Sequence, residues 1–489
     1  MTASEHALES LHETATAIFQ DALDACNIDS AFDRRIRFTD DGSGEVLTRL
    51  MPEGSGPTVL NLNDYRDIQV ISIGKAALPM LDTLLSRMKR RKGLRGICCS
   101  TESPTQRNWR FRYFEGGHPL PNDDSFAAAR AALALLRKAD KRTLVIFLIS
   151  GGSSALFDLP LDPAITLEDT IGFHNALIGS GAPITEINTI RKHFSAVKAG
   201  RLALAAAEAT KFNILLPDVP LRSLDTLASG PTSPDLTTSE EVREILAKYD
   251  LLAKFTPAVR DFFTHPRPNG EDISESLGIK NRLAPFLPRM PWSEKTEPSP
   301  AQEVDAFRDS VFEVLLSSHD LVESARTRAE QAGYFTVVDN ACDDWDYADA
   351  ARYLLERFHA LRAEHPRCCL ISGGEVTVTI DRTPGAGGRN MQFTLECAFD
   401  LAKHPGEQLL VFSAGSDGID GNTRSAGAIA DTTTISRATA FGYQPQKELD
   451  SFNACPLFTS LGDSVVTGHT GHNLRDLRLL ISELEPILN

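Results

Sequence analysis

Two acidic residues in the second half of the chain lie at glycine turns that follow apolar, strand-like runs. Glu375 ends the sequence SGGE after the run CCLI, and Asp417 lies in AGSDG after the run LLVFS. Paired carboxylates at such turns could hold Mg²⁺ against phosphate oxygens, because Mg²⁺ prefers oxygen ligands. A single loop acid is more often solvated, but matching positions in successive strand–helix units favour a binding role. We therefore interpret Glu375 and Asp417 as candidate metal ligands.

Two basic residues occupy comparable places. Arg389 follows a glycine loop between the two acids, and its guanidinium could offer a fork of donors to a phosphate or carboxylate. Lys75 follows an apolar run at the first turn of a predicted helix, where a cation opposes the helix dipole and so lacks an obvious structural reason. It could neutralise a transferred phosphoryl group. A surface salt bridge for Arg389 and a solvated side chain for Lys75 are the structural alternatives.

Another glycine turn, at residues 151–154, follows the most strand-like run in the first half of the chain. Gly151, Gly152, Ser153 and Ser154 could present backbone N–H groups and two hydroxyls to an anion. Glycine turns after strands are common, so a tight strand-to-helix connection explains the motif equally well.

Three further sets of residues are candidates for binding a substrate or a metal ion. Asn188, Arg191 and Lys198 share one face of a helix predicted over 185–207 and could bind a carboxylate, although a solvated basic face fits them equally well. Asp218 follows another strand and could orient or deprotonate a substrate hydroxyl. His469 and His472 have a metal-like spacing, but without nearby acids or cysteines in sequence we favour a structural role.

Strands alternate with helices in both halves, which predicts an α/β fold with mainly parallel sheets. Ligands bind such sheets at the carboxyl ends of strands, which is where Lys75 and the turn at residues 151–154 are predicted to lie. The chain of 489 residues exceeds one ordinary core, so at least two domains are expected. We predict an N-terminal domain over 1–262, a proline-rich connection over 263–305 and a C-terminal domain over 306–459.

Three segments carry more local expectations. Residues 4–26 form an amphipathic helix that should pack on the first domain. Residues 38–66 are rich in Gly, Asp, Asn and Pro and are interpreted as irregular. The last segment, from Leu461 to Glu483, is interpreted as a loop that enters a final helix.

Composition limits the classes of partner. The net charge of −16 argues against nucleic acid, which favours a basic face. Eight scattered cysteines without a C-x-x-C pair indicate reduced thiols in a cytoplasmic protein. The first twenty residues lack the apolar core of a signal peptide, and no apolar run is long enough for a bilayer, so no membrane is expected.

Several familiar nucleotide motifs are absent from the sequence. No G-x-G-x-x-G follows a strand, so a classical dinucleotide site lacks its fingerprint. No G-x-x-x-x-G-K-[ST] occurs either, so a kinase of this sequence would not be of the P-loop type.

Taken together, the motifs resemble those of the glycerate 2-kinase family, whose C-terminal part is called the MOFRL domain and whose members are often labelled hydroxypyruvate reductase. The matching stretches, in family order, are GKA at 74–76, GGHP at 116–119, SGGSS at 150–154, N-x-x-RKH at 188–193, SGPT at 229–232, SGGE at 372–375, GRN at 388–390 and GSDGIDG at 415–421. No single stretch is specific, but the ordered set spans nearly the whole chain.

The resemblance implies two Rossmann-like α/β domains around a central cleft, with a tail over 460–489 that can rejoin the first domain. It implies an ATP-dependent, Mg²⁺-assisted kinase that phosphorylates D-glycerate at its 2-hydroxyl, giving 2-phosphoglycerate and ADP. Lys75 and Arg389 match residues regarded as catalytic, and Glu375 and Asp417 match acids of the same cleft. The loop after Asp218 and the histidines near residue 470 depart from the family pattern, which leaves substrate preference open.

Two other functions stay open at this point. An NAD(P)H-dependent hydroxypyruvate reductase would need a nicotinamide site, for which the sequence offers no glycine fingerprint. A non-catalytic small-molecule sensor would be expected to carry an attached DNA-binding or signalling module. For the assembly we expect a monomer or a homodimer that binds glycerate and a nucleotide.

Overall fold

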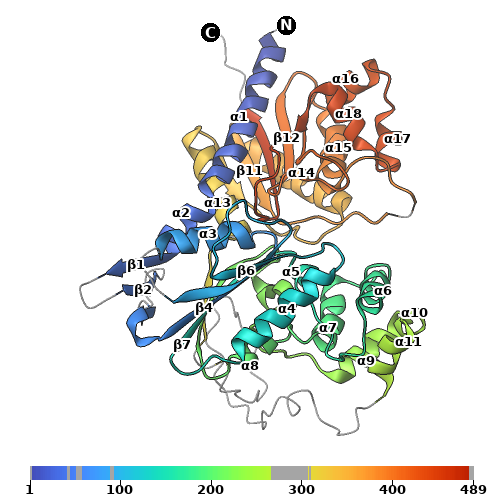
Figure 1. Ribbon diagram of the computed structural model, residues 1–489. Coiled ribbons are helices and arrows are strands. Elements are labelled where there is room, and N and C mark those ends of the chain that lie inside the picture. The colour runs from blue at the N-terminus through green and yellow to red at the C-terminus, as the bar shows by residue number, and fades with distance from the viewer. Residues whose placement is uncertain are drawn as a thin grey trace. The chain divides into compact units, whose positions relative to one another are not determined.

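The computed structural model describes residues 3–40, 45–50, 58–88, 93–265, 307, 310–380 and 382–483. The chain forms two compact units (Figure 1). We call Ala31–Leu315 the middle unit; Met1–Ser30 together with Leu316–Asn489 form the split unit. Each unit contains a six-stranded sheet and helices, which confirms the predicted two-domain α/β class.

The sheet of the middle unit is entirely parallel, as predicted. Its strand order is β6-β5-β4-β7-β8-β9. From β4 the chain adds β5 and β6 on one side of the sheet. It then returns to β7, next to β4, and adds β8 and β9 on the other side. The gap between the crossovers at β4 and β7 is the topological switch point, where α/β sheets bind ligands. The strands are β4 (Asp67–Ile73), β5 (Leu94–Ser100), β6 (Phe111–Glu115), β7 (Thr143–Ser150), β8 (Thr210–Leu216) and β9 (Ser310–Val314).

The helices of the middle unit build two cores. One covers the sheet, and the other joins α6, α7 and α9–α11 through stacked phenylalanines such as Phe173 and Phe194, whose ring centroids lie 4.0 Å apart. The helices are α2 (Ile28–Arg35, which spans the boundary between the units), α3 (Ala77–Arg87), α4 (Asp123–Leu136), α5 (Ser153–Leu156), α6 (Leu167–Ile178), α7 (Ile184–Phe194), α8 (Arg201–Ala205), α9 (Ser239–Lys248), α10 (Leu251–Lys254) and α11 (Pro257–Thr264), with 3-10 turns η1 (Leu62–Asp64) and η2 (Leu221–Ser229).

Residues 38–66 are more regular than predicted. Strands β1 (Ile36–Asp40), β2 (Glu45–Arg49) and β3 (Thr58–Asn61) form a small antiparallel sheet. The turn-forming residues of this segment lie largely between the short strands. The overall composition of the segment therefore did not indicate the strands. Arg49 at the end of β2 makes an ion pair with Glu313 of β9.

The sheet of the split unit is mixed, with order β10-β11-β15-β12-β13-β14. Only the β10–β11 pairing is parallel; the other four are antiparallel. The prediction of a final helix is wrong, because Asp476–Glu483 forms the strand β15, which lies between β11 and β12 in this sheet. Its first seven residues are all buried, so no alternation marks a strand, and its leucines and arginine favour helices intrinsically. The other strands are β10 (Phe335–Val338), β11 (Cys368–Gly373), β12 (Gln408–Gly415), β13 (Gly427–Asp431) and β14 (Ser464–Val465).

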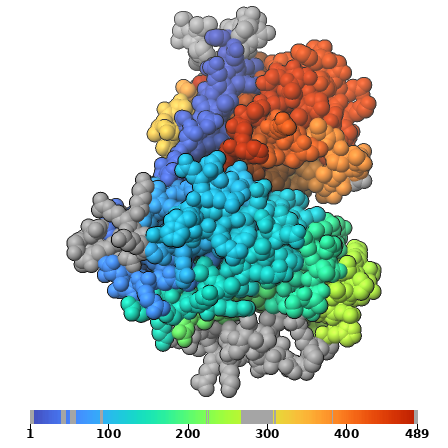
Figure 2. All heavy atoms as spheres, in the orientation of Figure 1, coloured from blue at the N-terminus to red at the C-terminus, as the bar shows by residue number. Residues whose placement is uncertain are grey.

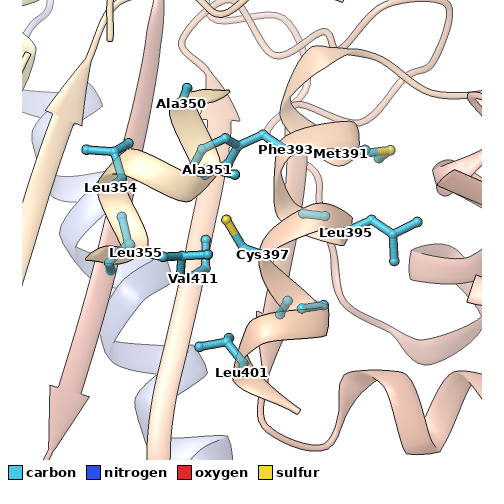
Figure 3. Close-up of a cluster of buried hydrophobic side chains, with 14 of the residues drawn as sticks. Ala350, Ala351, Leu354, Leu355, Met391, Phe393, Leu395, Cys397, Leu401 and Val411 are labelled. Atoms are coloured by element: carbon cyan, nitrogen blue, oxygen red, sulfur yellow. The ribbon is translucent and has the colours of Figure 1, made fainter. Parts of the chain in front are cut away.

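Helices cover both faces of this sheet. Val411 of β12 belongs to the apolar cluster formed by α14 and α15 (Figure 3). The next residue, Phe412, points to the opposite face and contacts Phe19 of α1, with ring centroids 5.0 Å apart. The helices are α1 (Ala3–Ala25), α13 (Ser318–Gln331), α14 (Tyr347–Glu364), α15 (Arg389–Leu401), α16 (Thr434–Ala440), α17 (Pro445–Asp450) and α18 (Ala454–Leu461).

The division of the chain differs from the predicted boundaries at both ends. Helix α1 packs on β12 and α13 of the split unit rather than on the first domain, and its blue surface lies along the orange and red surface in Figure 2. The described tail, β14 and β15, belongs to the sheet of the split unit. Most of the proline-rich connection over 263–305 lies outside the described residues. In the described ranges, no helix has the length and apolar character needed to cross a membrane.

We expect Phe19→Ala to destabilise the split unit. Phe19 is 1% exposed, and removing a buried phenyl ring costs about 3–5 kcal/mol because it loses apolar burial and leaves a cavity. Urea unfolding measures the change, with the exposed Gln20→Ala of the same helix as the control, expected to stay within about 0.5 kcal/mol of wild type. Equal stability of the two variants would show that α1 is not part of this core.

Candidate functional site

The parallel register of β4 and β7 places two turns side by side at the switch point. Ile73 pairs with Ile149, so the turn at Gly74-Lys75 lies beside the turn at Ser150-Gly151. The backbone N–H of Lys75 donates to the Gly151 carbonyl at 2.9 Å, and the N–H of Ala76 donates to the Ser150 hydroxyl at 3.0 Å. Gly74 has φ of +116°, and a Cβ there would lie 2.3 Å from that hydroxyl, so only glycine allows this approach.

Three polar side chains lie close to the Gly151–Gly152 turn. A Cβ on Gly151 would lie 2.0 Å from Asp218 Oδ2, and one on Gly152 would lie 2.9 Å from Lys75 Cγ and 3.4 Å from His118 Cδ2. Lys75, His118 and Asp218 follow the carboxyl ends of β4, β6 and β8. The two glycines therefore leave the space that these side chains line.

The serines of this turn have different roles. Ser153 is buried, and its hydroxyl donates to the Ser150 carbonyl at 2.6 Å, so it closes the turn. The Ser154 hydroxyl lies 3.2 Å from that of Ser229, which in turn donates to Asn188 Oδ1 at 3.2 Å. A hydrogen-bonded chain thus runs from the glycine turn to α7.

Arg191 ends this chain as a buried cation. The side chain is 8% exposed, and its Nη1 donates to Asn188 Oδ1 over a long 3.5 Å. Its Nε has no hydrogen-bond partner among the described residues. Buried donors are almost always paired, so this atom indicates an acceptor that the described residues do not supply. A small carboxylate or phosphate has that chemistry.

Lys198 does not join Asn188 and Arg191, contrary to the helical pattern. The predicted helix over 185–207 is broken after α7, and Ala199 and Gly200 adopt positive φ. Lys198 Nζ instead lies 2.7 Å from Asp158 Oδ1 in a buried ion pair, which His174 and Ser195 complete with hydrogen bonds to the same carboxylate. Burial alone would raise the pKa of Asp158, but Lys198 and His174 lower it below its usual value. This group is structural.

His118 was not among the predicted site residues, although it lies in one of the quoted motifs. Burial and the neighbouring charge of Lys75 lower the pKa of His118 to about 4. The imidazole is therefore neutral at neutral pH and can accept or donate one hydrogen bond at the site.

Arg389 lies at the first position of α15 in the split unit and bridges two carboxylates. Its Nε and Nη2 donate to Asp476 at 2.6 and 3.0 Å, and Nη2 lies 2.7 Å from Glu375 Oε1. Burial lowers the pKa of Arg389, but Asp476 and Glu375 outweigh burial and raise it. The sequence concealed Asp476 because this residue lies 87 positions away, in a segment predicted to be helical.

The two predicted metal ligands differ in their surroundings. Glu375 pairs with Arg389, which already neutralises its charge, whereas Asp417 is half-buried and accepts the Ile419 N–H through Oδ1 at 3.1 Å. Within the part of the chain that the structure describes, the group of three potential ligands close enough for a metal does not include either acid. Mg²⁺ often binds one or two carboxylates together with substrate phosphates, so a role for them stays a prediction. Likewise His472, 9% exposed, is not part of such a group.

Two family models match most of the described fold. A domain of unknown function, DUF4147, matches residues 14–264, and the MOFRL family matches residues 368–476. This pair of α/β regions, with a polar site at a switch point, is the arrangement in which α/β proteins bind small ligands.

Similar proteins narrow the class. The chain is 30% identical over 419 residues to glycerate 2-kinase of Pyrococcus horikoshii, covering 85% of this chain and 87% of that protein. It is 32% identical to D-glycerate 2-kinase of Thermotoga maritima, covering 75% and 79%. A crystal structure of glycerate kinase from Thermotoga maritima matches with a TM-score of 0.73 at 26% identity, over 97% of this chain and all of that one. The chain belongs to the glycerate 2-kinase family, as its motifs indicated.

We expect Lys75→Met to raise the pKa of His118 from about 4 towards, but not up to, its ordinary value of about 6.5, because burial remains when the charge is gone. Imidazole NMR titration measures the value, with His118→Gln to assign the signal and the exposed Lys138→Met as the control. An unchanged titration would show that the two side chains do not interact.

The lowered pKa of His118 in the wild-type protein also affects the free energy of unfolding. Because the folded state keeps His118 neutral below about 6.5 while the unfolded chain takes up a proton, its contribution to stability declines as pH falls from about 6.5 to about 4.

Proposed function

We propose that this protein is a kinase that transfers the γ-phosphoryl group of ATP to the 2-hydroxyl of D-glycerate, giving 2-phosphoglycerate and ADP. The kinase names of its relatives support the reaction class. The chemistry of the middle-unit site supports the assignment of residues. We also propose a cytoplasmic location, because all eight cysteines are free thiols.

The observation that carries the proposal is the placement of Asp218 next to Gly151 and of Lys75 next to Gly152 in the same turn. In phosphoryl transfer the protein acts mainly by positioning and by stabilising charge. Asp218 can accept the proton of the attacking hydroxyl, and Lys75 can stabilise negative charge on the transferred group. The two glycines let the backbone approach the reacting atoms closely.

Arg191 and Asn188 would recognise the substrate carboxylate. The buried Nε of Arg191 lacks an acceptor among the described residues, and a carboxylate is a fitting partner for a guanidinium. Ser154 and Ser229 extend the row of donors towards the glycine turn. This row can hold glycerate with its hydroxyls near Asp218.

The split unit would contribute groups that handle the nucleotide phosphates. Mg²⁺ arrives with ATP as part of the substrate, and Asp417 has a carboxylate that suits it. Arg389 is oriented by Asp476, so it could present its remaining donors to a phosphate while Asp476 acts as a positioning residue. Glu375 is better explained as a partner of Arg389 than as a metal ligand.

We expect D-glycerate to support ADP release by the full-length protein, and Lys75→Ala to lower kcat by roughly 10²–10³-fold, because charge on the transferred group loses its stabiliser. Lys138→Ala is the matched surface control, expected to keep full activity. Phosphorus NMR of the product distinguishes 2- from 3-phosphoglycerate.

Two results would contradict this assignment. One is no ADP release with D-glycerate; the other is full turnover by the Lys75→Ala variant. Oxidation of NADH on adding hydroxypyruvate would instead revive the reductase alternative, which lacks a glycine fingerprint here.

We expect Arg191→Gln to raise the KM for D-glycerate by roughly 10–100-fold and to leave the KM for ATP nearly unchanged, because a hydrogen bond to a charged group contributes about 1.5–3 kcal/mol. Steady-state kinetics with each substrate varied in turn measures the split, with the exposed Arg137→Gln as the control. Circular dichroism checks that the variant is folded. A rise in the KM for ATP alone would place Arg191 at the nucleotide instead.

A further inference from the structure

Two histidines and an aspartate gather at one end of α14 and α15 in the split unit. His359 lies in the last two turns of α14, Asp400 lies near the end of α15, and His404 follows in the next turn. One potential ligand atom from each of the three lies within 4.8 Å of the others. His359 Nε2 is 2.6 Å from Asp400 Oδ2, and the two imidazole rings are 5.0 Å apart.

This donor set suits a transition metal. Imidazole nitrogen and carboxylate oxygen are ligands that Zn²⁺ favours, and three protein ligands with one open position form a recognised type of zinc site. The hydrogen bond between His359 and Asp400 alone would be an ordinary structural feature. The third ligand, His404, comes from a different element and has no part in that bond, which makes the group more than a pair.

The spacing requires only small movements. Ligands of a tetrahedral Zn²⁺ lie about 3.4 Å apart, since each is about 2.0–2.2 Å from the ion. His359 Nε2 and Asp400 Oδ2 are closer than that, at 2.6 Å, and the ligand atoms of all three side chains lie within 4.8 Å of one another. The three side chains are 23–31% exposed, so each can rotate to adjust.

Outer contacts already orient two of the ligands. His404 Nδ1 lies 3.2 Å from Glu407 Oε1, so an Nδ1–H can donate to Glu407 and leave Nε2 with its lone pair for a metal. Glu407 in turn pairs with Arg362, and Asp400 Oδ1 accepts from Lys403 at 3.0 Å. Carboxylates that hold the second nitrogen of a metal-bound histidine are a regular part of zinc sites.

We propose that His359, Asp400 and His404 form a surface site for a divalent transition-metal ion such as Zn²⁺. The ion would join the C-terminal turns of α14 to the segment after α15, and thereby stabilise the two helices that cover one face of the sheet. Within the split unit the site is separate from Arg389, which begins α15, since Asp400 lies at the other end of that helix.

The test uses the full-length protein without an affinity tag, stripped of metal by chelation, and Zn²⁺ as the probe. We expect calorimetry to show one equivalent of Zn²⁺ bound. A hundredfold excess over the Kd should raise the midpoint of thermal unfolding by roughly 5 °C. His359→Ala with His404→Ala should lose both effects, while the exposed His319→Ala should retain them.

Two further measurements distinguish a specific metal site from nonspecific binding of Zn²⁺ at the surface. Co²⁺ should give the visible absorption of a low-coordinate ion in the wild type and not in the double variant. Glu407→Gln should weaken Zn²⁺ binding by about tenfold or more, as loss of an outer carboxylate does elsewhere. The proposal is overturned if the wild type binds no equivalent of Zn²⁺, or if the double variant binds it as tightly as the wild type.

Discussion

The site of the middle unit depends on the parallel pairing of β4 with β7. Two adjacent strands whose connections leave in opposite directions create a crevice at their carboxyl ends, where α/β sheets bind ligands. The hydrogen bond from the Lys75 N–H to the Gly151 carbonyl then fixes the two turns against each other. A one-residue shift of this pairing would move both turns at once, so the register of two buried strands sets the position of every group at the site.

The charges at this site differ from those elsewhere in the protein. Lys198 and Arg389 each have a carboxylate within 2.7 Å, so their burial is compensated inside the chain. Arg191 is 8% exposed, yet among the described residues its guanidinium has only a 3.5 Å hydrogen bond to the amide oxygen of Asn188. A buried cation with so weak a partner lowers stability, and proteins keep such groups mainly where a ligand supplies the missing charge. The contrast favours substrate binding over a structural role for Arg191.

The sequence predicted those features that local order determines. Strand ends and glycine turns located Lys75, Gly151 and Asp218, because residues that follow buried parallel strands must meet at one edge of the sheet. The sequence did not predict interaction partners that are distant in the chain and meet only in the fold. Asp476 lies in a strand whose uniform burial removes the alternation that identifies strands, so neither β15 nor the Arg389–Asp476 pair could be anticipated. The first helix was predicted, but its amphipathic pattern does not tell which sheet it covers.

Arg389 shows how a predicted role changes once its partners are known. As a motif residue it stands in a glycine loop and could serve as a free cation for phosphate. In the structure its Nε and Nη2 are held by a fully buried aspartate, and Nη2 also pairs with Glu375. Such a pair fixes the guanidinium plane, and the side chain is still 35% exposed. A fixed, partly exposed guanidinium binds phosphate with less loss of side-chain entropy than a mobile one. The salt bridge that served as the structural alternative is therefore compatible with the role proposed for Arg389.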